Sequence, residues 1–204
     1  MGIVKQLILR RPYLIPISGI VATVTGRGTI VSGKVEQGTL NLLDMSECVG
    51  FGKKANYAVT SISVSDKNRE SAKEGDDVSI LLRGAGKDDV VIGMVVATPG
   101  TVKEGKEFDA DIKIPVKDIG IPHNPFTDQK NVPNHKNVSE LEFQIRTARV
   151  PGTIQILSKI VTPGKYFSVH IKLAQSVALG TGLEVRIRNK TKVVATGIIR
   201  KVGP

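Results

Sequence analysis

The chain contains little cysteine and few aromatic residues, and both shortages exclude classes of protein. Its 204 residues include one cysteine, no tryptophan, five phenylalanines and three tyrosines. A single cysteine cannot form an internal disulfide, so we expect Cys48 to be a small buried hydrophobe. A protein that stacks the bases of single-stranded nucleic acid on aromatic side chains would have little to stack them on.

Long apolar runs and grouped metal ligands are also missing. No apolar run approaches the roughly 20 residues of a membrane-spanning helix, so we expect no membrane partner. The histidines His123, His135 and His170 have no cysteine or histidine at ligand spacing, so we expect no metal site. No serine lies in a nucleophile-elbow motif, and we expect this chain not to be an enzyme.

Basic residues exceed acidic ones. Lysine and arginine total 29 against 19 aspartates and glutamates, which gives a formal net charge of +10. The excess lies mostly in the second half of the chain. This balance favours an anionic partner such as RNA.

Apolar residues alternate with polar ones along much of the chain, with glycine, asparagine and proline signals between the runs. Such a pattern predicts half-buried strands in antiparallel barrels. We predict an all-β fold of two antiparallel β-barrels in tandem, with a linker stub at 1–11, a first barrel at 12–102 and a second at 103–204. The strands are expected at 14–24, 29–35, 57–64, 78–82, 108–116, 169–173 and 183–187, and two short helices at 66–73 and 87–92.

The stretch from Gly26 to Gly38 has two interpretations. Gly28, Gly33 and Lys34 satisfy the spacing of a phosphate-binding loop, but that loop needs Ser or Thr next to hold magnesium, and Val35 stands there. β-Branched residues flank the glycines, which favours strands over the helix that a phosphate loop opens. We therefore interpret the stretch as strand, turn and strand.

Several blocks resemble the second and third domains of elongation factor Tu, the GTPase that carries aminoacyl-tRNA to the ribosome. The first is Gly26-Arg27-Gly28-Thr29 with Val35-Glu36-Gln37-Gly38, and the next two are 74–84 and 93–102. Later blocks, in the same order as in that family, are 108–114, 123–126, 146–154, 163–183 and 197–202. The family's GTP-binding domain, which would hold GTP and magnesium, has no counterpart, so we expect no cofactor in this chain.

The resemblance implies two sets of tRNA-binding residues. In the family, the second domain forms one wall of the pocket for the aminoacylated 3′ end, and the third lies against the T-stem backbone. Carried over by position, the 3′-end region is Arg27, Ser32, Ser63, Ser65, Asp66 and Asp77. Ser63 and Asp66 replace the family's usual Glu and Arg, and Asp77 replaces an asparagine. The pocket expected here therefore differs in its chemistry from that of the family.

The backbone contacts expected on the second barrel are His123, Arg146, Gln175, Arg186, Arg188, Lys190 and Lys192. The sequence itself supports the last four. Arginines alternate with apolar residues at 183–188, and a turn at Asn189 leads to the two lysines, so the cations are predicted on one face of a hairpin. An ordinary solvated strand face would give the same pattern.

The partners implied are aminoacyl-tRNA, the ribosome, the GTPase domain of the same protein and a nucleotide exchange factor. Two other functions stay open. One is a basic β-barrel adaptor that binds ribosomal RNA or a protein without delivering tRNA, and the other is a related translation GTPase with another cargo. The family occurs in organelles and bacteria, and the basic balance and Lys/Asn-rich loops favour an organelle, the mitochondrial matrix, over the bacterial cytoplasm.

Overall fold

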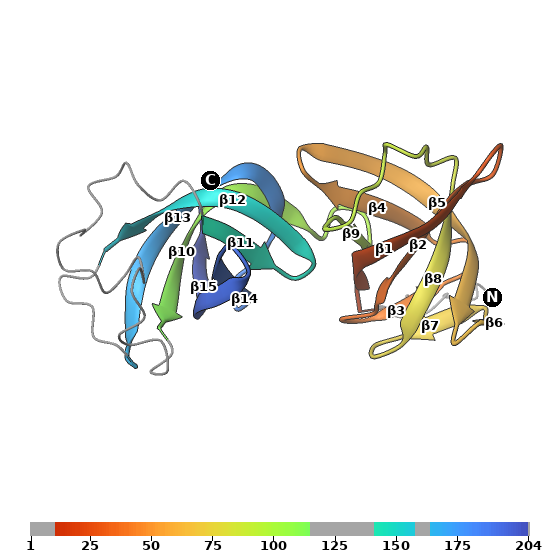
Figure 1. Ribbon diagram of the computed structural model, residues 1–204. Helices are drawn as coiled ribbons and strands as arrows, with labels where there is room; N and C mark the ends of the chain where they lie inside the picture. The colour runs from red at the N-terminus through yellow and green to blue at the C-terminus, as the bar shows by residue number, and fades with distance from the viewer. Residues whose placement is uncertain (1–10, 115–140, 158–163, 204) are drawn as a thin grey trace, which may run out of the picture. The chain divides into compact units, whose positions relative to one another are not determined.

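The computed structural model describes residues 11–114, 141–157 and 164–203, and these form strands and turns without a helix (Figure 1). The chain divides into two compact units. The first comprises Ala55–Val91, Val95–Thr101 and the chain up to Cys48; the second comprises Val49–Lys54, Ile92–Met94 and Val102–Pro204. The predicted all-β fold with two antiparallel barrels is confirmed.

The first barrel is a sheet in the order β4-β9-β1-β2-β8-β5-β6, and pairing of β4 with β5 closes the ring. Hydrophobic residues alternate into its interior, as in β8, where Val78, Ile80 and Leu82 are buried and their neighbours are not. Strands β3 and β7 form a separate two-stranded sheet. The strands are β1 (Leu14–Val24), β2 (Gly28–Lys34), β3 (Thr39–Asn41), β4 (Met45–Gly50), β5 (Lys53–Val64), β6 (Lys67–Asn68), β7 (Ser71–Lys73), β8 (Asp77–Arg83) and β9 (Val95–Ala97).

The second barrel is closed, with the strand order β10-β13-β12-β11-β14-β15. Its core is apolar and includes Phe108, Phe143 and Ile171, all almost completely buried. The strands are β10 (Lys103–Lys113), β11 (Leu141–Ile145), β12 (Ala148–Ile156), β13 (Tyr166–Leu179), β14 (Glu184–Asn189) and β15 (Lys192–Val202).

Both predicted helices are wrong. Ser65 and Asp66 have φ angles of 48° and 63°, and Ser63 and Val64 pair with Asn68 and Lys67. Two successive left-handed residues make the tight turn of a β-hairpin, which a helix cannot accommodate. In the second segment, residues 87–89 form a turn in which the Asp89 carboxylate accepts a hydrogen bond from the Gly86 N–H at 2.7 Å. The polar residues at the start of both segments therefore belong to turns and not to helices.

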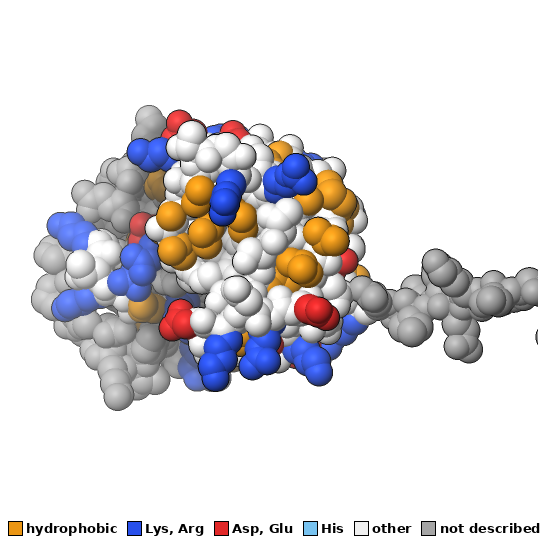
Figure 2. Space-filling view, turned by 90° about the vertical axis from the view of Figure 1, so that its right-hand side faces the viewer, with side chains coloured by type: hydrophobic (Ala, Val, Ile, Leu, Met, Phe, Trp, Pro, Cys, Tyr) orange, Lys and Arg blue, Asp and Glu red, His pale blue; other side chains and the backbone are white. Residues whose placement is uncertain are grey.

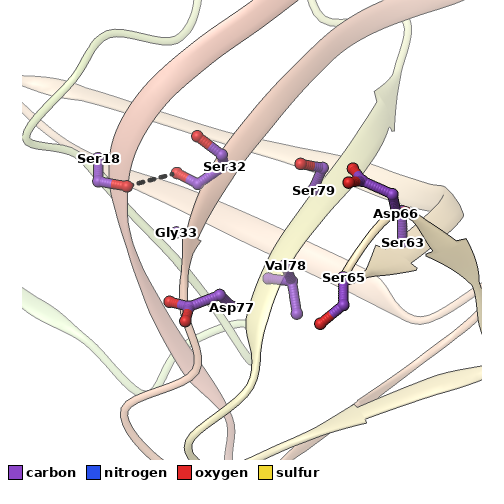
Figure 3. A pocket seen from close by; sticks show the side chains of 9 residues that line it. All are labelled: Ser18, Ser32, Gly33, Ser63, Ser65, Asp66, Asp77, Val78 and Ser79. Atoms are coloured by element: carbon purple, nitrogen blue, oxygen red, sulfur yellow. Dashed lines mark hydrogen bonds between the residues drawn. The ribbon is translucent and has the colours of Figure 1, made fainter.

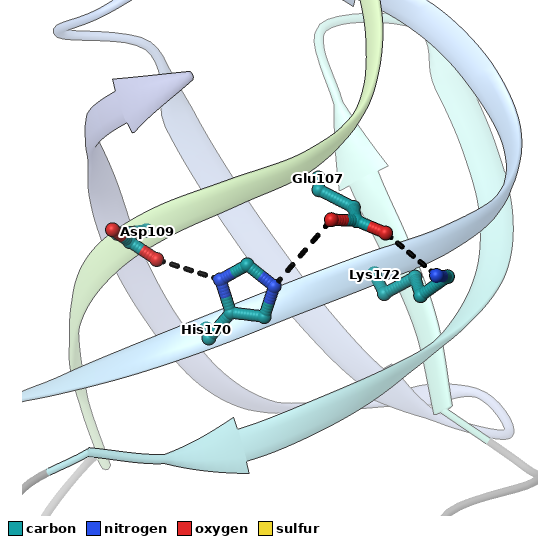
Figure 4. A network of polar contacts seen from close by, with 4 residues as sticks. All are labelled: Glu107, Asp109, His170 and Lys172. Atoms are coloured by element: carbon teal, nitrogen blue, oxygen red, sulfur yellow. Dashed lines mark hydrogen bonds and ion pairs between the residues drawn. The ribbon is translucent and has the colours of Figure 1, made fainter. Parts of the chain in front are cut away.

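An ionic ladder joins β10 to β13 on the outside of the second barrel (Figure 4). Lys172 Nζ lies 2.6 Å from Glu107 Oε1, and His170 Nδ1 lies 2.7 Å from Asp109 Oδ1. The other ring nitrogen of His170 lies 3.9 Å from Glu107. These directly opposed pairs fix the register of the two strands.

Two carboxylates of β10, Glu107 and Asp111, make the stability of the second barrel depend on pH. The hydrogen bond from Lys172 lowers the pKa of Glu107, and those from Ser168 and Arg200 lower the pKa of Asp111. Because both folded pKa values are depressed, the stabilisation is present above the ordinary carboxyl pKa of about 4 and is lost as pH falls below it. We expect amide protection in β10 and β13 to drop on acidification, and Glu107→Gln with Asp111→Asn to flatten that dependence in hydrogen exchange. An unchanged pH profile in the double variant would contradict this.

Candidate functional site

A polar pocket of about 280 Å³ lies on the outside of the first barrel. It collects five of the six residues predicted for the tRNA 3′ end, namely Ser32, Ser63, Ser65, Asp66 and Asp77 (Figure 3). These residues come from β2, β5, the β5–β6 turn and β8, so segments far apart in the sequence meet here. The lining is completed by Ser18, Gly33, Val78 and Ser79.

Strand register puts the serines in a row. Ser32 of β2 is paired with Ser79 of β8, and Ser79 is paired on its other side with Ser63 of β5. Buried neighbours on each strand turn these three side chains outward. The Ser18 hydroxyl also donates to the Ser32 carbonyl at 3.3 Å, which fixes the β1 side of the pocket.

The chemistry of the pocket is hydroxyl and carboxylate. No lysine or arginine is among its lining residues, whereas Asp66 and Asp77 bring two carboxylates. Hydroxyls both donate and accept hydrogen bonds, and ionised carboxylates only accept them. The lining therefore suits a ligand that carries hydroxyls and an ammonium group, and it offers no cation to a phosphate.

An apolar row, which was not predicted from the sequence, borders the serine row. Ile30 and Leu81 are paired across β2 and β8, two residues from Ser32 and Ser79, and both are partly exposed on the same outer face. An apolar surface beside a row of hydroxyls can bind a planar ring next to a sugar. The alternation in 28–34 and 77–83 was visible in the sequence, but only the register brings these two residues together.

Arg27 does not line the pocket. It lies before β2, five residues from Ser32, which corresponds to about 16 Å along a strand. Its carbonyl accepts a hydrogen bond from Gly84 at 3.0 Å. The guanidinium therefore belongs to the end of the barrel where the β1–β2 turn meets the end of β8.

The basic hairpin is the turn between β14 and β15 with Arg186, Arg188, Lys190 and Lys192. Arg186 is held by Glu184, with Nε 2.9 Å from Oε1, and this carboxylate raises the pKa of Arg186. Arg188 is mostly covered and donates to the Thr191 carbonyl at 2.8 Å. Lys190 and Lys192 are exposed, and among the described residues neither has an ion-pair partner. The two lysines are thus the charges most available to an anion.

The other described residues predicted for the tRNA backbone lie away from Lys190 and Lys192, because Arg146 follows Ile145, which is paired with Val185 toward the other end of β14. Arg146 lies in the β11–β12 turn with a φ of 52° and donates to the Ala178 carbonyl at 3.3 Å. Gln175 is exposed on β13, which lies opposite β14 in the ring. His123 lies outside the described residues.

No second chemical centre competes with the pocket among the described residues. They contain no group of three or more His, Cys, Asp or Glu that could hold a metal ion, and no helix long and apolar enough to cross a membrane. Burial raises the pKa of the Cys48 thiol to about 12, as expected for a buried hydrophobe. On the face in Figure 2, lysine and arginine side chains gather along the lower edge, and acidic side chains are isolated.

The sequence matches the family model for elongation factor Tu domain 2 over residues 28–97. The match covers β2 to β9 and contains the pocket residues other than Ser18. The first unit is therefore a β-barrel domain of the kind found in translation GTPases. Partners within the translation machinery are consistent with such a domain.

Proposed function

We propose that this chain is the two-barrel RNA-binding part of an elongation-factor-Tu-like GTPase, which docks aminoacyl-tRNA for delivery to the ribosome. The observation that carries this proposal is the pocket on the first barrel, where a serine row lies beside the apolar pair Ile30 and Leu81 within the segment that matches elongation factor Tu domain 2.

The pocket chemistry suits the 3′-terminal nucleoside with its amino acid. The hydroxyls of Ser32, Ser63 and Ser79 would hydrogen-bond the ribose, and Ile30 with Leu81 would support the base. The carboxylate of Asp77 would attract the protonated amino group of the aminoacyl ester. On the ligand, the ribose hydroxyls and the base are uncharged and the amino group is cationic. None of these groups needs a cation in the pocket, in agreement with a lining that has none.

The second barrel would contribute the contact to the duplex stem. Lys190 and Lys192 are exposed and unpaired within the described part of the chain, so they can neutralise backbone phosphates. Such contacts are independent of base sequence, as a carrier of many tRNAs requires. GTP binding and hydrolysis would belong to a separate domain of the same protein. A nucleotide exchange factor would act on that domain. We favour the mitochondrial matrix, with the bacterial cytoplasm as the alternative.

One observation favours a second candidate, a basic adaptor that binds ribosomal RNA or a protein without carrying tRNA. Asp66 and Asp77 place two negative charges at the pocket, and Glu184 neutralises Arg186 on the second barrel. An adaptor of this kind would bind structured RNA without regard to its 3′ end.

Filling the pocket should separate the two functions. Ser79 lies at the centre of the serine row, so Ser79→Leu should remove hydrogen bonds to the ribose and obstruct the pocket. We expect about tenfold weaker binding of aminoacyl-tRNA, which corresponds to about 1.4 kcal/mol. Asn56→Leu, an exposed position on β5 outside the pocket, is the matched control and should bind like the parent. Unchanged binding by the Ser79 variant in a filter assay would favour the adaptor.

A further inference from the structure

The outer face of β8 changes its chemistry from one end to the other. Asp77, Ser79, Leu81 and Arg83 point outward in turn, because Val78, Ile80 and Leu82 between them are buried. Alternate residues of a strand are about 6.6 Å apart, so the carboxylate end and the guanidinium end are separated by about 20 Å. The face therefore runs from acid through hydroxyl and apolar surface to base.

A second arginine lies at the basic end. Arg83 is paired with Gly28 on β2, and Arg27 immediately precedes that glycine. The Gly84 N–H donates to the Arg27 carbonyl at 3.0 Å, which ties the turn before β2 to the end of β8. The Thr29 hydroxyl, fully buried, lies 2.8 Å from the Ala85 carbonyl and strengthens the same junction. The two arginines thus project from a backbone fixed in place.

This basic corner is open to a ligand. Arg27 and Arg83 are exposed, and neither has an ion-pair partner among the described residues. At Gly26 and Gly84 beside them, no atom outside the adjacent residues lies within 4 Å of where a side chain would begin. The nearby Asp89 is engaged by the Gly86 N–H. Two exposed arginines flanked by glycines therefore leave this end of the barrel accessible to an anion.

We propose that Arg27 and Arg83 form a phosphate-binding subsite for the RNA strand just upstream of the 3′-terminal nucleoside. This inference rests on the proposed function, which places that nucleoside in the serine pocket. Ser79 and Arg83 are about 13 Å apart along β8, so a strand whose end occupies the pocket passes the arginines with its preceding phosphodiesters. The opposite charges at the two ends of β8 fix the direction: the phosphates lie toward Arg83 and the amino group toward Asp77.

The direct test is the salt dependence of tRNA binding by Arg27→Gln with Arg83→Gln in the full chain. Each lost phosphate contact on a single strand lowers the slope of log K against log salt by about 0.7, so the double variant should lose about 1.4. The ratio of the parent's affinity to the variant's affinity should then be about 25 times larger at 0.1 M salt than at 1 M salt. Arg83→Lys with Arg27 intact should keep the slope, because the charge remains. Arg69→Gln with Lys73→Gln removes two exposed charges of the same barrel and should change the slope little.

A phosphate-free probe distinguishes this inference from the proposed function. A 3′-aminoacyl adenosine analogue without phosphate should bind the parent and the Arg27/Arg83 double variant equally, because it occupies only the pocket. A double variant with the parent's slope and affinity for tRNA, or a control variant that loses as much, would overturn the phosphate subsite and leave the pocket assignment intact. If the parent binds neither tRNA nor the analogue, the proposed function itself is wrong.

Discussion

Replacement of Gly28 by alanine should lower the free energy of unfolding of the first barrel by at least about 3 kcal/mol. Gly28 has a φ of 138°, and a Cβ atom there would collide with the Leu82 carbonyl oxygen and approach the Gly84 nitrogen to 2.9 Å. Both neighbours are backbone atoms of the paired strand and the turn after it, so neither can move aside cheaply. Urea unfolding followed by hydrogen exchange of the β2 and β8 amides would measure the loss.

Gly26→Ala is the matched control. Gly26 also has a positive φ, 74°, but no atom outside the adjacent residues lies within 4 Å of the added atom. Only the left-handed conformation is then penalised, at about 1 kcal/mol. Similar losses in the two variants would show that β2 does not approach β8 as closely as described, and the register that forms the serine row would be in doubt.

Reversing the charges of Lys190 and Lys192 should be the most damaging change on the second barrel for RNA binding. For a duplex stem, each lost phosphate contact lowers the salt slope by about 0.9, so Lys190→Glu with Lys192→Glu should lower it by about 1.8. The ratio of the parent's affinity to the variant's affinity should then be about 60 times larger at 0.1 M salt than at 1 M salt. Arg186→Gln should have a much smaller effect, because Glu184 already neutralises this guanidinium.

The control for this reversal is Lys103→Glu with Lys106→Glu, which makes the same change of net charge on the same barrel. Both lysines are exposed near the start of β10, whereas the β14–β15 turn lies beyond the other end of that strand, where Lys113 is paired with Thr196. If the control weakens binding as much as the Lys190/Lys192 reversal, net charge rather than the hairpin attracts the RNA, and the role assigned to these two lysines is wrong. Equilibrium titration over a range of salt concentrations measures both variants.

Alternation of apolar residues was enough to predict the barrels, and strand β1 begins and ends where the sequence placed it, at Leu14 and Val24. The pocket on the first barrel could be predicted from the sequence only in part. Its residues from Ser32 to Asp77 were identified by position in a resembling family, whereas Ser18, Ser79 and the apolar pair Ile30 and Leu81 depend on strand register, which is a property of the whole sheet.

Charge patterning was less reliable than alternation. The sequence grouped four cations on one hairpin, but it could not show that Glu184 pairs with Arg186 or that Arg188 turns to the Thr191 carbonyl. Both contacts depend on side-chain geometry within the folded hairpin. In the β5–β6 turn, the polar residues Ser65 and Asp66 suggested a helix, whereas their left-handed conformation reverses the chain.

Removal of the 3′-terminal nucleoside from the tRNA tests directly whether the pocket on the first barrel holds the end of a tRNA. We expect the shortened tRNA to bind about tenfold more weakly, because it loses the hydrogen bonds to the serine row. The salt slope should change by no more than about 0.7, the value for one phosphate. Equal affinity for the intact and shortened tRNA would contradict this role of the pocket and support an adaptor that recognises RNA only through its backbone.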